Sequence, residues 1–287
     1  MGSDQRVASA SSIAIDEMAE REYNLRLRHP ERGAVYDRCS LASEALRRKE
    51  DRFTSLRYGA SASSLVDFFP ADVAGPAPLF LFIHGGYWRA LDRRIFSFVA
   101  RPWLDCGVHV ALPGYELAPA ASVRAIADQI SAAVDWLLRN ARSLGVDASR
   151  VIVSGHSAGA HLGALALSRR TDWSARAFVG ISGVYDLQPL LGTTVNRDIR
   201  LDADEARSLS PQWLRGDTAA RYLCAYGGAE TEGFRRQSRD YAAALRVQGC
   251  RAEMLEVPAR THFDILDDLA DAGAPLFKRA HALLSDR

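Results

Sequence analysis

The sequence lacks the features that mark secreted, lipidated or membrane-spanning proteins. Its 287 residues include four cysteines, none of them in a C-x-x-C pair or at metal-ligand spacing. The N-terminus, MGSDQRVASASS, has no apolar signal-peptide core, and Arg6 breaks the myristoylation pattern. No apolar run approaches the length of a membrane span. These absences favour a cytoplasmic protein without a disulfide framework.

The sequence also lacks an excess of charge of either sign. Its 36 basic and 35 acidic residues give a formal net charge of +1. This balance provides no electrostatic basis for binding nucleic acid or an anionic membrane surface, so we expect a small-molecule partner. A homodimer is compatible with the sequence, which leaves the oligomeric state open. With 48% hydrophobic residues, the chain is long enough to bury a substantial core.

Strand-like and helix-like segments alternate along most of the chain. Short apolar runs predict strands at 64–70, 76–86, 107–115, 149–154, 176–187, 218–228 and 250–259. Helical patterns lie at 122–145, 160–168, 234–249 and 264–287. This alternation predicts an α/β fold with a mostly parallel twisted sheet covered by helices on both faces. In such sheets the chemistry gathers in loops at the carboxyl ends of the strands.

The segment before the first expected strand has a different character. Residues 1–11 are small and polar and are expected to be disordered, whereas 12–30 and 38–52 have helical patterns. We interpret 12–57 as a helical extension of a single domain, whose core is residues 58–287.

The motif GHSAGAH at 155–161 is the most informative stretch. Gly155, Ser157 and Gly159 fit the pattern G-x-S-x-G, in which a serine sits on a strained turn between a strand and a helix. The alternative is a glycine-rich turn with an incidental serine. The strand at 149–154 and the helix at 160–168 stand in the order that the first interpretation needs, which favours Ser157 as a nucleophile.

A second motif, HGGYW at 84–88, directly follows an apolar strand. Glycines at this place let backbone amides approach the negative charge that develops during acyl transfer. We expect the amides of Gly85 or Gly86, together with that of Ala158, to form an oxyanion hole. Tyr87 and Trp88 are expected at the pocket mouth, although a core or lid position is the alternative for Trp88. The side chains predicted to face the substrate are His84, Tyr87 and Trp88.

One of the seven histidines follows the last expected strand in a loop. This residue, His262, is the predicted general base. The acid that orients it should follow the strand at 218–228, and Glu230 is the first acid there. Glu232, Asp240 and Asp186 are the alternatives. With Glu230, the chain order is serine, acid, histidine, as in α/β-hydrolases.

The motifs resemble those of the kynurenine formamidases (arylformamidases), a group of α/β-hydrolases related to hormone-sensitive-lipase-like esterases. The matching segments span about residues 58–265. HGGYW discriminates most, because many esterases of the wider group have HGGG or HGGA. The family often has Asp at the position of Glu230, and glutamate can perform the same task. The other matching segments are YGASASSLVDFFP (58–70), LPGYELAP (112–119), GHSAGAHL (155–162), ISGVYDLQPL (181–190), GGAETEGFRRQS (227–238) and THF (261–263).

The resemblance implies a serine hydrolase with no cofactor and no metal. The expected reaction cleaves an aryl formamide such as N-formylkynurenine to the free amine and formate through an acyl-enzyme. It also implies a role in tryptophan catabolism and places the helical extension over the pocket. A general carboxylesterase acting on small acyl or aryl esters would use the same triad. An inactive hydrolase fold that binds a ligand is a third hypothesis.

Overall fold

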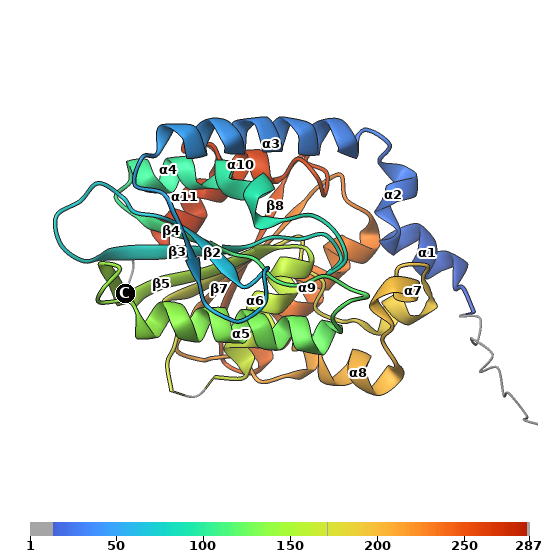
Figure 1. Ribbon diagram of the computed structural model, residues 1–287. Coiled ribbons are helices and arrows are strands. Elements are labelled where there is room, and N and C mark those ends of the chain that lie inside the picture. Colours follow the sequence, from blue (N-terminus) through green and yellow to red (C-terminus); the bar gives the residue numbers. More distant parts are fainter. Residues whose placement is uncertain (1–13, 171, 286–287) are drawn as a thin grey trace, which may run out of the picture.

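In the described residues, eight strands form one sheet in the order β1-β2-β4-β3-β5-β6-β7-β8 (Figure 1). The structure is a computed structural model that describes residues 14–170 and 172–285. The pairs β1–β2 and β2–β4 are antiparallel, and all other neighbours are parallel. The predicted mostly parallel sheet is therefore confirmed. The strands are β1 (Thr54–Arg57), β2 (Leu65–Phe69), β3 (Ala77–Ile83), β4 (His109–Pro113), β5 (Val146–His156), β6 (Ala177–Ile181), β7 (Arg221–Gly227) and β8 (Arg251–Val257).

Helices cover both faces of this sheet (Figure 1). One face packs against α5 (Val123–Arg139), α6 (Ala158–Ser168) and α9 (Glu232–Val247). The other face packs against α3 (Arg32–Lys49), the 3-10 segment η1 (Arg93–Ala100), α4 (Arg101–Asp105), α10 (Leu266–Leu269) and α11 (Pro275–Ala282).

The central strand β3 supplies both cores. Leu79 and Leu81 belong to the core on the α5 and α6 side, whereas Phe80 and Phe82 belong to the opposite core. Side chains alternate between the two faces of a strand, so an uninterrupted apolar run such as LFLFI serves both layers. The run therefore fixes β3 in the middle of the sheet, directly before the HGGYW motif.

Short helices gather near the ends of the strands that carry the candidate site residues. The helices α1 and α2 lie beside one another at one end of the molecule, next to α7 (Figure 1). The segment between β6 and β7 is built from several short turns of helix. The elements of these regions are α1 (Glu17–Tyr23), α2 (Leu25–Arg28), η2 (Gln188–Gly192), α7 (Asn196–Ile199), α8 (Ala203–Ser208) and η3 (Pro211–Trp213).

The N-terminal region differs in detail from the sequence expectation. The helical pattern at 12–30 is divided at Asn24 into α1 and α2, and α3 begins at Arg32 rather than at 38. Thr54–Arg57 pairs with β2, so the sheet already begins within the range assigned to the extension. This edge strand is mostly exposed and carries no apolar run, which is why its sequence gave no strand signal. The expectation for residues 1–11 lies outside the described residues.

The C-terminal region also differs. The single helix expected at 264–287 is replaced by α10 and α11. Asp271 accepts a hydrogen bond from the amide of Gly273 in a turn between them, and Pro275 opens the second helix. A proline is tolerated in the first turn of a helix but not in its interior, which sets this break.

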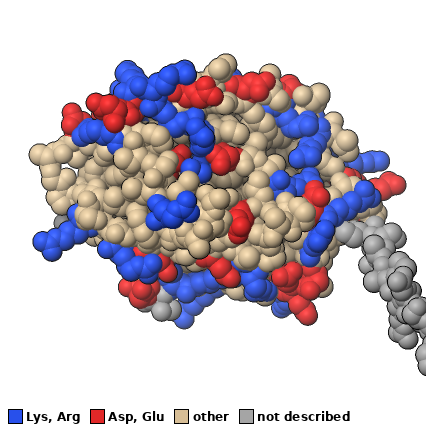
Figure 2. Space-filling model, viewed as in Figure 1, with Lys and Arg blue, Asp and Glu red and all other residues tan. Residues whose placement is uncertain are grey.

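The surface shown in Figure 2 carries basic and acidic side chains interspersed with one another. This agrees with the balanced composition of the chain. No helix in the described part of the chain combines the length and the apolar character needed to cross a membrane.

Candidate active site

Ser157 occupies a strained turn between β5 and α6. Its backbone angles are φ 55° and ψ −119°, outside the regions that L-residues favour. A Cβ atom on Gly155 would overlap the backbone of Gly159, and one on Gly159 would overlap the carbonyl oxygen of Ile83. Both positions therefore require glycine. The turn has the geometry that the pattern G-x-S-x-G predicts.

The HGGYW loop lies directly against this turn. A Cβ atom on Gly85 would stand 2.8 Å from the carbonyl oxygen of His156 and 3.1 Å from Cβ of Ser157. Gly86 has φ 117° and lines the same pocket as Ser157. Within the described residues, the amides of Gly86 and Ala158 donate no hydrogen bond to the protein. Two backbone donors thus stand near the serine without an internal partner.

His262 and Glu230 come from the loops that follow β8 and β7. Nδ1 of His262 lies 3.0 Å from Oε2 of Glu230, and both side chains are buried. The other carboxylate oxygen, Oε1, accepts hydrogen bonds from the hydroxyl of Ser182 at 2.5 Å and from the amide of Gly227 at 2.6 Å. Because Nδ1–H donates to the carboxylate, Nε2 of His262 keeps its lone pair free to accept a proton.

The other acids considered from the sequence do not reach His262. Glu232 is half-exposed on the first turn of α9, where it pairs with two arginines. Asp186 accepts a hydrogen bond from the amide two residues later. Asp240 lies in α9, where its main-chain carbonyl accepts a hydrogen bond from the side chain of Gln212. Of these four acids, all in the described residues, Glu230 alone contacts the histidine.

Sequence reasoning missed the roles of two residues that contact Glu230 and His262. Ser182 holds the carboxylate of Glu230, and its only sequence signal is its place at the end of a parallel strand. In the sequence, His156 is visible simply as a member of the GHSAGAH motif. Its Nε2 lies 2.8 Å from the main-chain carbonyl oxygen of His262, and the two rings are 4.7 Å apart. Burial holds the pKa of His156 well below its ordinary value.

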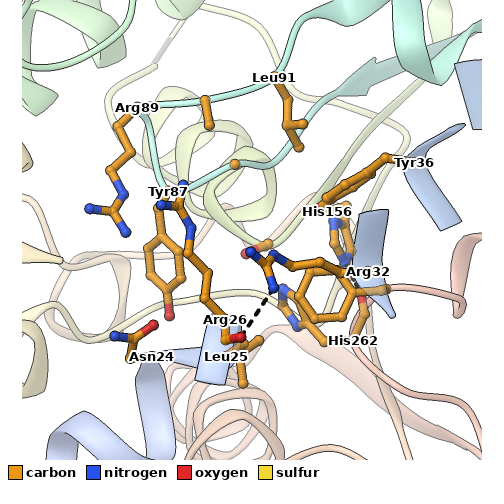
Figure 3. Close-up of a pocket in the computed structure, with 14 residues that line it drawn as sticks. Asn24, Leu25, Arg26, Arg32, Tyr36, Tyr87, Arg89, Leu91, His156 and His262 are labelled. Atoms are coloured by element: carbon orange, nitrogen blue, oxygen red, sulfur yellow. Dashed lines mark hydrogen bonds between the residues drawn. The ribbon is translucent and has the colours of Figure 1, made fainter. Parts of the chain in front are cut away.

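A cavity of about 140 Å³ opens over Ser157 and His262 (Figure 3). Its wall combines Asn24 and residues of α2 and α3 with residues of the segment 86–91 that follows β3. The expectation that the helical extension covers the pocket is confirmed by this lining. Tyr36 of α3 and Phe263 provide apolar surface, with their rings edge to face at 5.8 Å.

Tyr87 lies on the pocket wall, as expected. Its hydroxyl donates a hydrogen bond of 2.5 Å to the carbonyl oxygen of Tyr23, the last residue of α1. This bond joins the HGGYW loop to the helical extension. Tyr87 therefore shapes the pocket and also holds its cover in place.

The expectation that Trp88 lies at the pocket mouth is wrong. The indole is fully buried, and its ring stands edge to face with that of His161 at 5.0 Å. Tyr87 and Trp88 both have positive φ angles, so the chain turns sharply between them and directs the larger apolar ring into the core. The alternative core position is the one that Trp88 adopts.

His84 also does not face the pocket. Its ring is sandwiched against Tyr115, with centroids 4.2 Å apart, and against Phe96 at 5.8 Å. Nδ1 donates to the carbonyl oxygen of Gly85 at 2.8 Å, and burial lowers the pKa of His84 to about 4. His84 is therefore a neutral support for the glycine loop rather than a substrate contact.

Comparison with known proteins agrees with this geometry. A model of the alpha/beta hydrolase fold matches residues 80–265, which contain Ser157, Glu230 and His262. The chain belongs to the α/β-hydrolase family. It is 32% identical to a kynurenine formamidase of Salmo salar over 75% of this chain and 76% of that protein. It is 29% identical to esterase LipC of Mycobacterium tuberculosis over 79% of this chain and 62% of that protein.

A solved structure shows the same relationship. The structure of a candidate thioesterase from Silicibacter sp. TM1040 is 31% identical in sequence and superposes with a TM-score of 0.76. The match covers 88% of this chain and 94% of that one. The protein is thus a hydrolase, and the resemblance to kynurenine formamidases drawn from its motifs is confirmed. Among the described residues, no group of three His, Cys, Asp or Glu side chains is placed to hold a metal ion.

Proposed function

We propose that the protein is a serine hydrolase that deformylates an aryl formamide such as N-formylkynurenine. Ser157 is the nucleophile, His262 the general base and Glu230 the acid that orients it. The observation that carries the proposal is the 3.0 Å contact between His262 and Glu230 beside a pocket that Ser157 and His262 both line. The similarity to a kynurenine formamidase supports the formamide as substrate.

The first half of the reaction forms a formyl-enzyme. Nε2 of His262 takes the proton of the Ser157 hydroxyl as its oxygen attacks the formyl carbon. The carbonyl oxygen becomes an oxyanion and accepts hydrogen bonds from the amides of Gly86 and Ala158, with Gly85 as the alternative to Gly86. The C–N bond then breaks, and the imidazolium gives its proton to the departing arylamine.

The second half releases formate. Water enters as the arylamine leaves, and His262 takes a proton from it as its oxygen attacks the formyl ester. The tetrahedral intermediate collapses, and the proton returns to Ser157. Glu230 stabilises the imidazolium in both halves and keeps its charge throughout.

The aromatic side chains of the wall suit an aryl group. Tyr36, Tyr87 and Phe263 line the pocket and offer ring faces or edges to a substrate. With such a substrate the protein would serve tryptophan catabolism, and the proposal includes a cytoplasmic location. A homodimer stays a prediction.

A carboxylesterase is the second candidate, because the chain is also similar to an esterase. Steady-state kinetics on N-formylkynurenine and on p-nitrophenyl acetate separate the two, with Ser157→Ala as the control. A much higher kcat/KM on the formamide, lost in the variant, supports the formamidase. Fast ester cleavage with negligible deformylation keeps the triad and overturns the formamide as substrate. Binding without hydrolysis of either compound would identify an inactive fold.

A further inference from the structure

The active-site pocket is lined by charges of a single sign. Arg26, Arg32 and Arg89 contribute to its wall, and no Asp or Glu of the described chain does so. The surface in Figure 2, by contrast, mixes both signs. Figure 3 shows Arg89 across the pocket from His156 and His262, on the side of Tyr87. Arg26 and Arg32 thus come from the helical extension, and Arg89 comes from the loop after β3. Of the three, Arg89 stands across the pocket from the histidines.

Acidic side chains neutralise only part of this charge. Arg89 is largely buried and forms an ion pair with Asp198, but its Nε is buried and has no partner in the described residues. Arg32 is held by main-chain groups, since it donates to the carbonyl oxygens of Arg26 and His29 at 3.1 and 3.0 Å. No ion pair of Arg26 is formed within the part of the chain that the structure describes. The pocket therefore keeps an excess of positive charge.

The arginines also act on one another. Burial lowers the pKa of Arg26 from its ordinary value, and the charges of Arg89 and Arg32 lower it further. Asp198 opposes this effect only in part. Like charges held together on one pocket wall are stabilised when an anion enters between them.

We infer that the pocket binds a carboxylate carried by the substrate away from the scissile bond, with Arg26 and Arg89 as specificity-determining residues. The inference rests on the proposed function, because it takes Ser157 and His262 as the reacting end. A guanidinium matches a carboxylate with two parallel hydrogen bonds, and such charged bonds are stronger than neutral ones. The preferred substrates are then aryl formamides or esters whose leaving group carries a carboxylate.

Two pairs of substrates test this inference. The first pair is N-formylkynurenine and its analogue with a neutral carboxamide in place of the carboxylate. The second pair is an acetate ester of a phenol with a propanoate side chain and the ester of the matching propanamide. For each pair, kcat/KM is measured with the wild type, with Arg26→Gln and with Arg28→Gln. Arg28 is the matched control, because it lies on the same short helix and is exposed like Arg26, but it stands outside the pocket lining.

The expected result is a preference of the wild type for the carboxylate member of each cleaved pair, on the order of tenfold. Arg26→Gln should lower the ratio severalfold, mainly through KM, with Arg89 accounting for the remainder, and Arg28→Gln should keep the ratio of the wild type. Salt gives a readout without a variant. In the ester pair, which carries no ammonium group, added NaCl should raise KM for the propanoate and leave KM for the propanamide unchanged.

Two outcomes would overturn the inference. One is an equal kcat/KM of the wild type on both members, and the other is a proportional loss on both in Arg26→Gln. Cleavage of the esters without deformylation would overturn the formamidase proposal alone, because the ester pair still reports the effect of the carboxylate.

Discussion

Nε2 of His156 lies 2.8 Å from the main-chain carbonyl oxygen of His262. A carbonyl oxygen only accepts hydrogen bonds, so Nε2 carries a proton and donates it. Burial lowers the pKa of His156 well below its ordinary value, and the nearby His262 lowers it further. The residue before the proposed nucleophile is therefore a neutral donor that fixes the loop of the proposed base. His156 is a positioning residue, since it acts on the reaction through His262.

Replacing His156 should reduce turnover more than binding. In His156→Leu the buried carbonyl of His262 loses its donor, which costs about 1–3 kcal/mol of folding free energy. The loop of His262 then loosens, and we expect kcat to fall at least ~10-fold with a smaller change in KM. His156→Gln keeps an N–H donor and should recover part of kcat. Urea unfolding and steady-state kinetics check this, and an unchanged kcat in His156→Leu would rule out the positioning role.

The charge of Glu230 and the hydroxyl of Ser182 that holds this carboxylate should differ in their importance for catalysis. Glu230→Gln removes the charge that stabilises the imidazolium, and we expect kcat/KM to fall by roughly 10³-fold or more. Ser182→Ala removes one of the two donors to Oε1 and leaves the amide of Gly227, so a loss below ~10-fold is expected.

Kinetics of the two variants on one substrate give this ranking. Near-normal activity in Glu230→Gln would show that another acid, such as Asp186, supports the histidine. An equal loss in both variants would show that the hydroxyl of Ser182 is as important as the charge.

Alanine should have very different effects at Gly85 in the HGGYW loop and at Gly33 in α3. Gly85→Ala places a Cβ atom 2.8 Å from the carbonyl oxygen of His156, so the loop must shift away from Ser157. Displacing the oxyanion donors should lower kcat by on the order of 100-fold to 1000-fold. Gly33→Ala is the matched control, because its Cβ atom would meet nothing within 4 Å. It should keep full activity and gain up to about 1 kcal/mol of stability. Full activity in Gly85→Ala would place the oxyanion donors elsewhere.

The parts of the site that could be predicted from sequence are those that local rules dictate. The turn at Ser157 needs glycine on both sides, so its pattern is visible in five residues. The apolar run of β3 predicts a central strand and therefore the place of Gly85 and Gly86 at its end. His262 could be found because it alone follows the last strand in a loop.

The parts that could not be predicted depend on distant contacts or on backbone angles. The HGGYW motif predicts Trp88 at the pocket mouth, but the positive φ of this residue directs the ring into the core. Ser182 is 48 residues from the acid that it holds, and no local pattern joins them. Likewise, Arg26 and Arg89 line one pocket from separate segments. Each is an ordinary surface charge when seen in sequence alone.

Two buried histidines make stability depend on pH. His84 and His161 are both buried, and burial lowers the pKa of each to about 4. An exposed histidine in the unfolded chain has a pKa of about 6.5. Between these values the unfolded state binds protons that the folded state does not. Stability should therefore fall as the pH falls through this window, by on the order of 1 kcal/mol per pH unit for each histidine.

His161→Gln should reduce this dependence. Nε2 of His161 donates to the carbonyl oxygen of Leu209 at 2.8 Å, and a glutamine can offer an N–H donor there without titrating. The free energy of unfolding, measured in urea between pH 4.5 and 8, should fall less steeply below pH 6.5 in the variant than in the wild type. Above pH 7 the slopes of the two proteins should agree, because His161 is neutral in both the folded and the unfolded state. Equal slopes below pH 6.5 would mean that the folded protein takes up a proton at His161 as readily as the unfolded chain does.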